Sequence, residues 1–192
     1  MQYTHFASIV LAMLLGAWTS SAAGQITYSF SSPNYSAGSI GGGGTPQYTT
    51  AMKIEGTFTL TKAPPPNFDG PIDSSMIRAW SFHDGVHNFT KANSAFRATL
   101  MTDSSGGVTG YLIGAYSPGR PLAGQRFNSL GIVCNATACK AFVGSNVICQ
   151  QQPPDGKVCE AVGGDGKTNA AGVEVPPGRL VIKAIGTGRS TQ

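Results

Sequence analysis

Residues 75–91 read SMIRAWSFHDGVHNFTK, and this stretch decides the fold class. Asp84-Gly85 is a two-residue turn signal between two runs rich in aromatic residues, which is the pattern of a β-hairpin. A turn at these two residues predicts Phe82 opposite His87, with the aromatic side chains on one face. The same register places His83 and His87 on opposite faces, which disfavours a shared metal ion.

Alternating apolar and polar residues continue on both sides of this hairpin. Residues 25–30 and 51–61 each read as a half-buried strand before it, and residues 96–101 and 108–116 form a second predicted hairpin after it. The 26 glycines and 12 prolines interrupt any long helical period. Short strands with frequent turns predict an all-β fold, either an antiparallel β-sandwich or a jelly-roll-like arrangement.

The N-terminal residues carry the features of a secretory signal peptide. Residues 6–18 are apolar and residues 19–24 are small, which suits cleavage after residue 23 or 24. The apolar run is shorter than the roughly 20 residues that a membrane-spanning helix needs. We therefore expect a signal-peptide helix at 1–24 and a single β-sandwich domain at 25–192, secreted or periplasmic, with no membrane span in the mature form.

All four cysteines lie in the C-terminal part of the expected domain, at Cys134, Cys139, Cys149 and Cys159. An even number of cysteines in an exported chain predicts two disulfides. Three pairings are possible, and sequential pairing is preferred because it closes two short loops. The spacing lacks the close Cys-x-x-Cys pairs of structural zinc sites, so no metal is expected here.

The charge is sparse and slightly basic. The chain carries 13 Lys and Arg against 9 Asp and Glu, a net charge of +4. No acidic residue occurs between Ser104 and Pro154, where only Arg120, Arg126 and Lys140 are charged. This stretch is either a surface for an acidic polymer or an ordinary weakly basic region. Runs of Lys and Arg are absent from the sequence, so nucleic acid is not an expected partner.

No catalytic or cofactor-binding motif stands out in the sequence. Nucleophile-elbow and phosphate-loop patterns each fail at a required glycine, and most carboxylates occupy turn positions where aspartate is expected anyway. We therefore assign no catalytic, cofactor-binding or metal-ligating residue. Exposed aromatic residues are the alternative route to function, and Tyr111 and Tyr116 are the main candidates to face a ligand, with Tyr35 and Tyr48 as further candidates.

Four segments between residues 51 and 116 resemble bacterial exported proteins of the PEP-CTERM type. They are EGTFTL (55–60), IRAWSF (77–82), DGV (84–86) and TDSSGGVT (102–109). The resemblance implies an envelope or extracellular β-sandwich, with no catalytic residue to carry over. Residues 185–192 contain neither a Pro-Glu-Pro signal nor a basic tail. The resemblance therefore does not extend to the C-terminal sorting anchor, and a soluble product is expected.

The sequence favours an exported, non-catalytic β-sandwich that binds extracellular polysaccharide or another surface component, with no cofactor. Two alternatives stay open. One is a secreted hydrolase that acts on polysaccharide through an unrecognised pair of carboxylates. The other is a structural protein of a surface layer or matrix.

Overall fold

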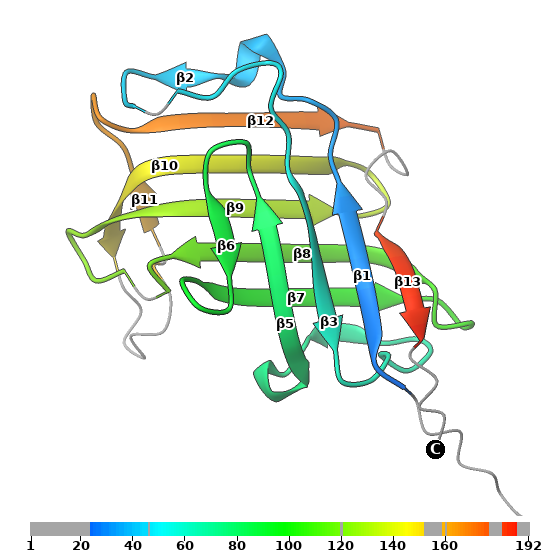
Figure 1. Cartoon of the computed structure of the whole chain (residues 1–192). Coiled ribbons are helices and arrows are strands. Elements are labelled where there is room, and N and C mark those ends of the chain that lie inside the picture. The colour runs from blue at the N-terminus through cyan, green and yellow to red at the C-terminus, as the bar shows by residue number, and fades with distance from the viewer. Residues whose placement is uncertain are drawn as a thin grey trace, which may run out of the picture.

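A computed structural model describes residues 24–45, 47–119, 121–151, 159, 161–176 and 182–187. Within these residues the protein is all-β, and two antiparallel sheets pack face to face (Figure 1). The predicted fold class is thereby confirmed. The predicted signal peptide lies outside the described residues, apart from Gly24.

The smaller sheet has five strands in the order β13-β1-β3-β5-β6. In chain order its members are β1 (Ile26–Ser31), β3 (Glu55–Leu60), β5 (Ile77–His83), β6 (Asn88–Thr90) and β13 (Lys183–Thr187). Short 3-10 turns at Ala37–Ser39 and Ser74–Met76 lie in the connections.

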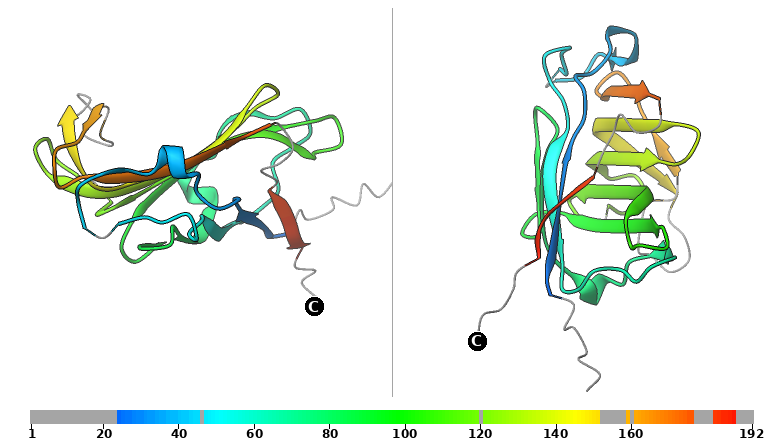
Figure 2. Two further views of the ribbon diagram at one scale, coloured as in Figure 1. Left: turned by 90° about the horizontal axis from the view of Figure 1, so that it is seen from above. Right: turned by 90° about the vertical axis from the view of Figure 1, so that its right-hand side faces the viewer.

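The larger sheet follows the order β2-β12-β10-β9-β8-β7-β4, and β11 pairs with β10 beside it. Its strands are β2 (Gly41–Gly42), β4 (Asp69–Pro71), β7 (Ala95–Thr102), β8 (Val108–Ser117), β9 (Arg126–Cys134), β10 (Cys139–Gln151), β11 (Ala161–Gly163) and β12 (Asn169–Val175). Its strands run crosswise to those of the smaller sheet, and the side view shows the two layers (Figures 1 and 2). This is the crossed form of sheet packing.

The main core lies between the two sheets. The smaller sheet contributes aromatic side chains such as Phe58 and Phe82, and the larger sheet contributes mainly aliphatic ones such as Ile113, Leu130 and Ile132. All five are almost fully buried. Because side chains alternate along a strand, the residues between them on β8 and β9 face away from the core. Those outward-facing residues form the candidate site.

The hairpin at the tip of β5 and β6 differs from its predicted register. Phe82 pairs with Phe89, and the four residues from Asp84 to His87 form the connection. The reason is that the Asp84 carboxylate accepts hydrogen bonds from the backbone N–H groups of Val86 and His87, which stabilises a longer turn. The predicted pairing of Phe82 with His87 is therefore wrong by two residues. A shift of two conserves the face that each side chain occupies.

Both disulfides follow the sequential pairing. Cys134 bonds to Cys139 across β9 and β10, where the two residues are direct register partners. Cys149, near the end of β10, bonds to Cys159, just before β11. The prediction of two local loops is confirmed.

Strand β10 contains a β-bulge near its middle. Gly144 pairs with Ser129, whereas Val147 pairs with Phe127, so β10 holds one residue more than β9 over this interval. Asn146, inside the bulge, has φ of 55°. A bulge of one residue reverses the alternation of side chains beyond it.

The consequence of the bulge is a second small core, here called the satellite cluster. It consists of Phe127, Val147, Cys149 and Cys159, with Tyr116 packed against it. Phe127 has the same parity along β9 as the outward-facing residues, so this cluster lies on the outer face of the larger sheet. The end of β10 and β11 accordingly bend away from the smaller sheet (Figure 2).

Candidate functional site

A groove with a volume of about 340 Å³ lies on the outer face of the larger sheet. Strands β7, β8, β9 and β10 form its floor, and the satellite cluster and β11 close one end. The residues that line it are Arg97, Leu112, Ile113, Gly114, Tyr116, Ser129, Leu130, Gly131, Ile132, Val133, Phe142, Cys159 and Val162.

A row of residues crosses the floor of the groove from strand to strand. Arg97, Gly114, Gly131, Phe142 and Gly172 are successive register partners on β7, β8, β9, β10 and β12. Gly114 and Gly131 belong to the groove lining, so the backbone itself forms part of the floor, and the row continues beyond the lining to Gly172. The side chains of Arg97 and Phe142, on either side of these two glycines, can therefore lie down over the sheet.

Phe142 lies down in this way. A Cβ atom at Gly131 would overlap the Phe142 ring, which shows that the ring covers the glycine backbone. Phe142 is nevertheless 51% exposed. A half-exposed aromatic ring held against a strand is a platform on which a flat apolar surface can stack.

The walls of the groove are mostly apolar. Leu112 is 41% exposed and Val162 is 56% exposed, and Val133, the register partner of Leu112 on β9, also belongs to the lining. Contiguous exposed apolar surface on a single sheet face is typical of a binding site.

Arg97 and Tyr116 provide the polar part of the groove. The Arg97 guanidinium donates a hydrogen bond to the Tyr116 hydroxyl over 2.7 Å. The Tyr116 ring packs on Phe127 of the satellite cluster, with ring centroids 6.0 Å apart. The satellite cluster thus holds the Tyr116 ring in place, and the Tyr116 hydroxyl in turn positions the Arg97 guanidinium.

No described residue in the lining of the groove is a carboxylate. A pair of carboxylates for glycoside hydrolysis is therefore not found at this place among the described residues. Asp155 and Glu160 lie outside the described residues. Within the described chain, no three His, Cys, Asp or Glu residues are grouped so as to hold a metal ion. The arrangement is suited to holding a ligand by stacking and by hydrogen bonds from arginine and hydroxyl groups.

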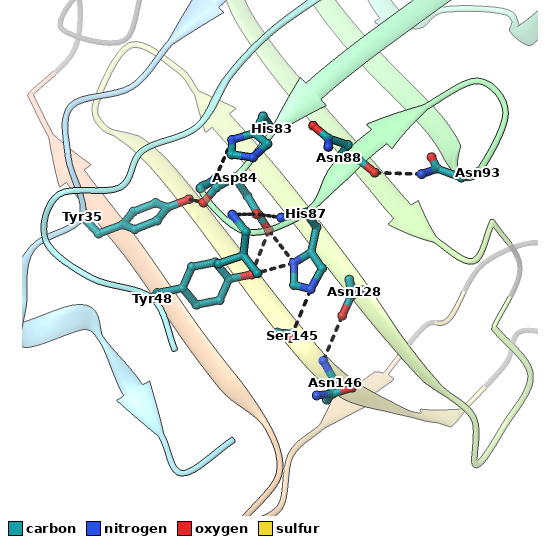
Figure 3. Close-up of polar contacts among 12 residues, drawn as sticks. Tyr35, Tyr48, His83, Asp84, His87, Asn88, Asn93, Asn128, Ser145 and Asn146 are labelled. Carbon is teal, nitrogen blue, oxygen red and sulfur yellow. Dashed lines mark hydrogen bonds and ion pairs between the residues drawn. The ribbon is translucent and has the colours of Figure 1, made fainter. Parts of the chain in front are cut away.

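A second polar site surrounds Asp84 at the tip of the β5–β6 hairpin (Figure 3). Asp84 is fully buried, and its carboxylate accepts hydrogen bonds from the backbone of Val86 and His87 and, over 2.8 Å, from the Tyr48 hydroxyl. Burial alone raises the pKa of Asp84, but the hydrogen bonds from His87, Tyr48 and Val86 outweigh it, so the pKa lies below its usual value. Asp84 is therefore a buried anion held by donors.

The same site brings together an aspartate, a histidine and a serine. His87 Nδ1 lies 3.2 Å from Asp84 Oδ2, and its Nε2 lies 3.5 Å from Ser145 Oγ (Figure 3). This is the order of groups in a nucleophilic triad. Ser145, however, is only 1% exposed, so no substrate can reach its hydroxyl in this structure. The contacts instead tie the hairpin tip to β10 of the facing sheet.

His83 takes no part in this cluster. It points away from His87, and its ring accepts a hydrogen bond from the Gly85 N–H over 3.0 Å (Figure 3). The two histidines thus lie apart, although His87 belongs to the connection and strand alternation therefore does not place it.

Of the four tyrosines singled out in the sequence, Tyr116 alone lines the groove. Tyr111 is 6% exposed and packs edge-on against Phe30 in the main core. Tyr35 and Tyr48 are buried around Asp84, where burial and the nearby carboxylate raise both tyrosine pKa values.

Sequence reasoning missed Phe142 and Arg97. The signal for Phe142 was its position between Ala141 and Val143, because both neighbours face the core and the ring must then face outward. Arg97 shows no local signal, since its role depends on the register of β7 against β8.

Among the described residues there is no helix of the length and apolar character that a membrane crossing requires. Neither protein-family models, nor curated proteins, nor solved structures show a match to this chain.

Proposed function

We propose that this protein is an exported, non-catalytic β-sandwich that binds extracellular polysaccharide in the groove on the outer face of its larger sheet. The observation that carries the proposal is the half-exposed Phe142 ring lying on the glycine backbone of Gly131. The Phe142 ring is not part of either hydrophobic core, and its exposed face is open to a ligand.

The chemistry of the groove fits a sugar ring. A pyranose has a C–H face that stacks on an aromatic ring, and an edge of hydroxyl groups that form hydrogen bonds. Phe142 supplies the apolar surface, while Arg97, Tyr116 and Ser129 supply polar groups in the same lining. An apolar cleft with a few convergent polar groups is the usual form of a small-molecule site.

Export is supported by the features of residues 1–24 and by the two disulfides, because disulfides persist in oxidising compartments. Sequencing the N-terminus of the protein recovered from its host tests this part. We expect the mature chain to begin at Gly24 or Gln25. A protein recovered from the cytoplasm with its N-terminal segment intact would contradict export.

The groove is tested by Phe142→Ala, with binding to a panel of insoluble and soluble polysaccharides measured by pull-down and calorimetry. Loss of the stacking surface should weaken binding about tenfold, which corresponds to about 1.4 kcal/mol. Phe142→Tyr conserves the ring and should bind as the original protein does. Leu122→Ala is the matched control, because Leu122 is equally exposed but lies outside the groove lining.

A second variant tests the same platform without removing the ring. Gly131→Ala forces Phe142 out of place, because the added methyl group would occupy the position of the ring. Gly38→Ala is its control, since nothing lies within 4 Å of a Cβ atom there. Unchanged polymer binding in Phe142→Ala and Gly131→Ala would exclude the groove as the site. A change of oligomeric state without polymer binding would point to self-association instead.

A further inference from the structure

The groove is electrostatically one-sided. Its strands β8, β9 and β10 come from the acid-free stretch between Ser104 and Pro154. Among the described residues, Arg97 is the one charged residue in its lining. Charge of one sign in a groove with apolar walls favours ligands of the opposite sign.

Arg97 differs from the other basic residues near it in lacking an acidic partner among the described residues. Lys140 pairs with Glu174 over 3.0 Å, and Arg126 pairs with Asp165 over 2.5 Å. The described side-chain hydrogen bond of Arg97 is to the Tyr116 hydroxyl, which carries no charge that could neutralise it. The charge of Arg97 is thus available to a ligand.

The position of Arg97 suits a carboxylate on a bound polymer. Arg97 lies over Gly114, since a Cβ atom there would come within 3.3 Å of its Nε. A guanidinium group has five N–H donors in a planar fork that matches a carboxylate, and one bond to Tyr116 leaves the others free to bind one. Strands β7 and β10 are three interstrand steps apart, about 14 Å at the usual spacing, so one chain can reach both Arg97 and Phe142 only by running across the strands.

We propose that the groove selects polysaccharides that carry carboxylate groups, with Arg97 as the residue that determines this specificity. This inference rests on the proposed function of the groove. Phe142 stacks on one sugar ring of the chain, and Arg97 binds the carboxylate of another. Tyr116 acts as a positioning residue, because its hydroxyl holds the guanidinium over the floor.

The experiment compares acidic polymers with their own neutral forms. Polygalacturonate and alginate are each tested beside the same polymer after chemical reduction of its carboxyl groups to alcohols, by calorimetry on the purified protein. We expect the acidic form to bind at least tenfold more tightly. Arg97→Gln should remove this preference, because it lowers the affinity for the acidic form more than the affinity for the reduced form. Arg97→Lys, which retains the charge without the fork, should lose part of the preference.

Two further variants make the test specific. Lys62→Gln removes the same charge from an exposed connection outside the groove and should leave the preference unchanged. Tyr116→Phe retains the ring but removes the hydroxyl that holds the guanidinium, and should reduce the preference for the acidic form. Thermal melts of all variants check that each is folded.

The outcomes separate the two proposals. If the acidic and the reduced polymers bind equally well, and both lose affinity in Phe142→Ala, the proposed preference for carboxylates is overturned. The proposal that the groove binds polysaccharide would then still stand. If Lys62→Gln and Arg97→Gln reduce the preference for the acidic polymer equally, the specific role of Arg97 is overturned, because the net charge of the protein would then account for the preference. Absence of binding to every polymer would overturn both proposals. Preferential binding to phosphatidylglycerol vesicles would replace the polysaccharide by a lipid surface.

Discussion

At the scale of single residues, Asp84 shows how this protein keeps a charge in its interior. Desolvation opposes ionisation, yet two backbone N–H groups, Tyr48 and His87 surround the carboxylate with donors. A buried carboxylate that accepts several hydrogen bonds is stabilised as the anion. The turn, the loop that carries Tyr48 and the facing strand that carries Ser145 all depend on this one side chain.

Replacing the carboxylate should therefore cost stability in a pH-dependent manner. The pKa of Asp84 is lower in the folded state than in the unfolded chain, so its stabilisation is present above the unfolded value, about 3.9, and is lost as pH falls through the folded value. We expect Asp84→Asn to lower the free energy of unfolding by about 2 kcal/mol near neutral pH. The difference in the free energy of unfolding between Asp84→Asn and the original protein should become smaller at acid pH. Urea unfolding at several pH values measures it.

Asp69→Asn is the control, because Asp69 lies exposed on β4. It should leave stability almost unchanged. A deficit for Asp84→Asn that stays constant from neutral to acid pH would contradict the account of Asp84 as a buried anion.

The residue scale is also where sequence reasoning was least successful. Tyr111 and Tyr116 lie on the same strand five positions apart, so they have opposite parity, and one faces the core while the other faces the groove. Choosing between them requires knowledge of which face is buried. The extended turn at Asp84 was missed because side-chain hydrogen bonds to the backbone outweighed the two-residue turn preferred by Asp-Gly.

At the scale of elements, β10 organises the larger sheet. Its first half pairs with β12 and β9, and beyond the bulge β11 takes the place of β12. The bulge redirects Val147 and Cys149 to the outer face, where they support Tyr116. A periodic pattern in the sequence cannot show such a change, because an inserted residue looks like any other.

The two disulfides should differ in function although they are close in the same sheet. Each closes a short loop, and its removal should lower the free energy of unfolding by about 2 kcal/mol. Only the Cys149–Cys159 bond contributes to the groove, through Cys159. We expect the Cys149→Ala/Cys159→Ala variant to lose polysaccharide affinity, and the Cys134→Ala/Cys139→Ala variant to retain it. Calorimetry on both variants, with melting curves, tests this, and equal affinities would contradict it.

At the scale of the whole molecule, the sequence predicted the all-β class, the antiparallel sheets and the pairing of cysteines. These depend on local alternation, turn residues and loop length. The order of strands and the crosswise packing could not be predicted, because they depend on contacts between distant segments. Strands β1 and β13, for example, pair across almost the full length of the chain.

One core between two sheets implies that both unfold together. Phe58 is almost fully buried and packs on Tyr28 of its own sheet and Phe96 of the other. We expect Phe58→Ala to lower the free energy of unfolding by about 3 to 5 kcal/mol. Circular dichroism and the fluorescence of Trp80, the one tryptophan after residue 24, should give the same urea midpoint. Separate midpoints would show that the sheets unfold independently.

The placement of both disulfides also determines how the molecule would respond to mechanical force. The smaller sheet contains no cysteine. Its neighbouring strands β1 and β13 are the first and the last of the described strands. Tension applied through the two ends would separate this antiparallel pair like a zipper, one hydrogen bond after another, in either redox state. Once the larger sheet is reached, the oxidised cross-links would shorten the length of chain that can be extended. The smaller sheet would thus separate without any covalent restraint, whereas the disulfides would limit the extension of the larger sheet.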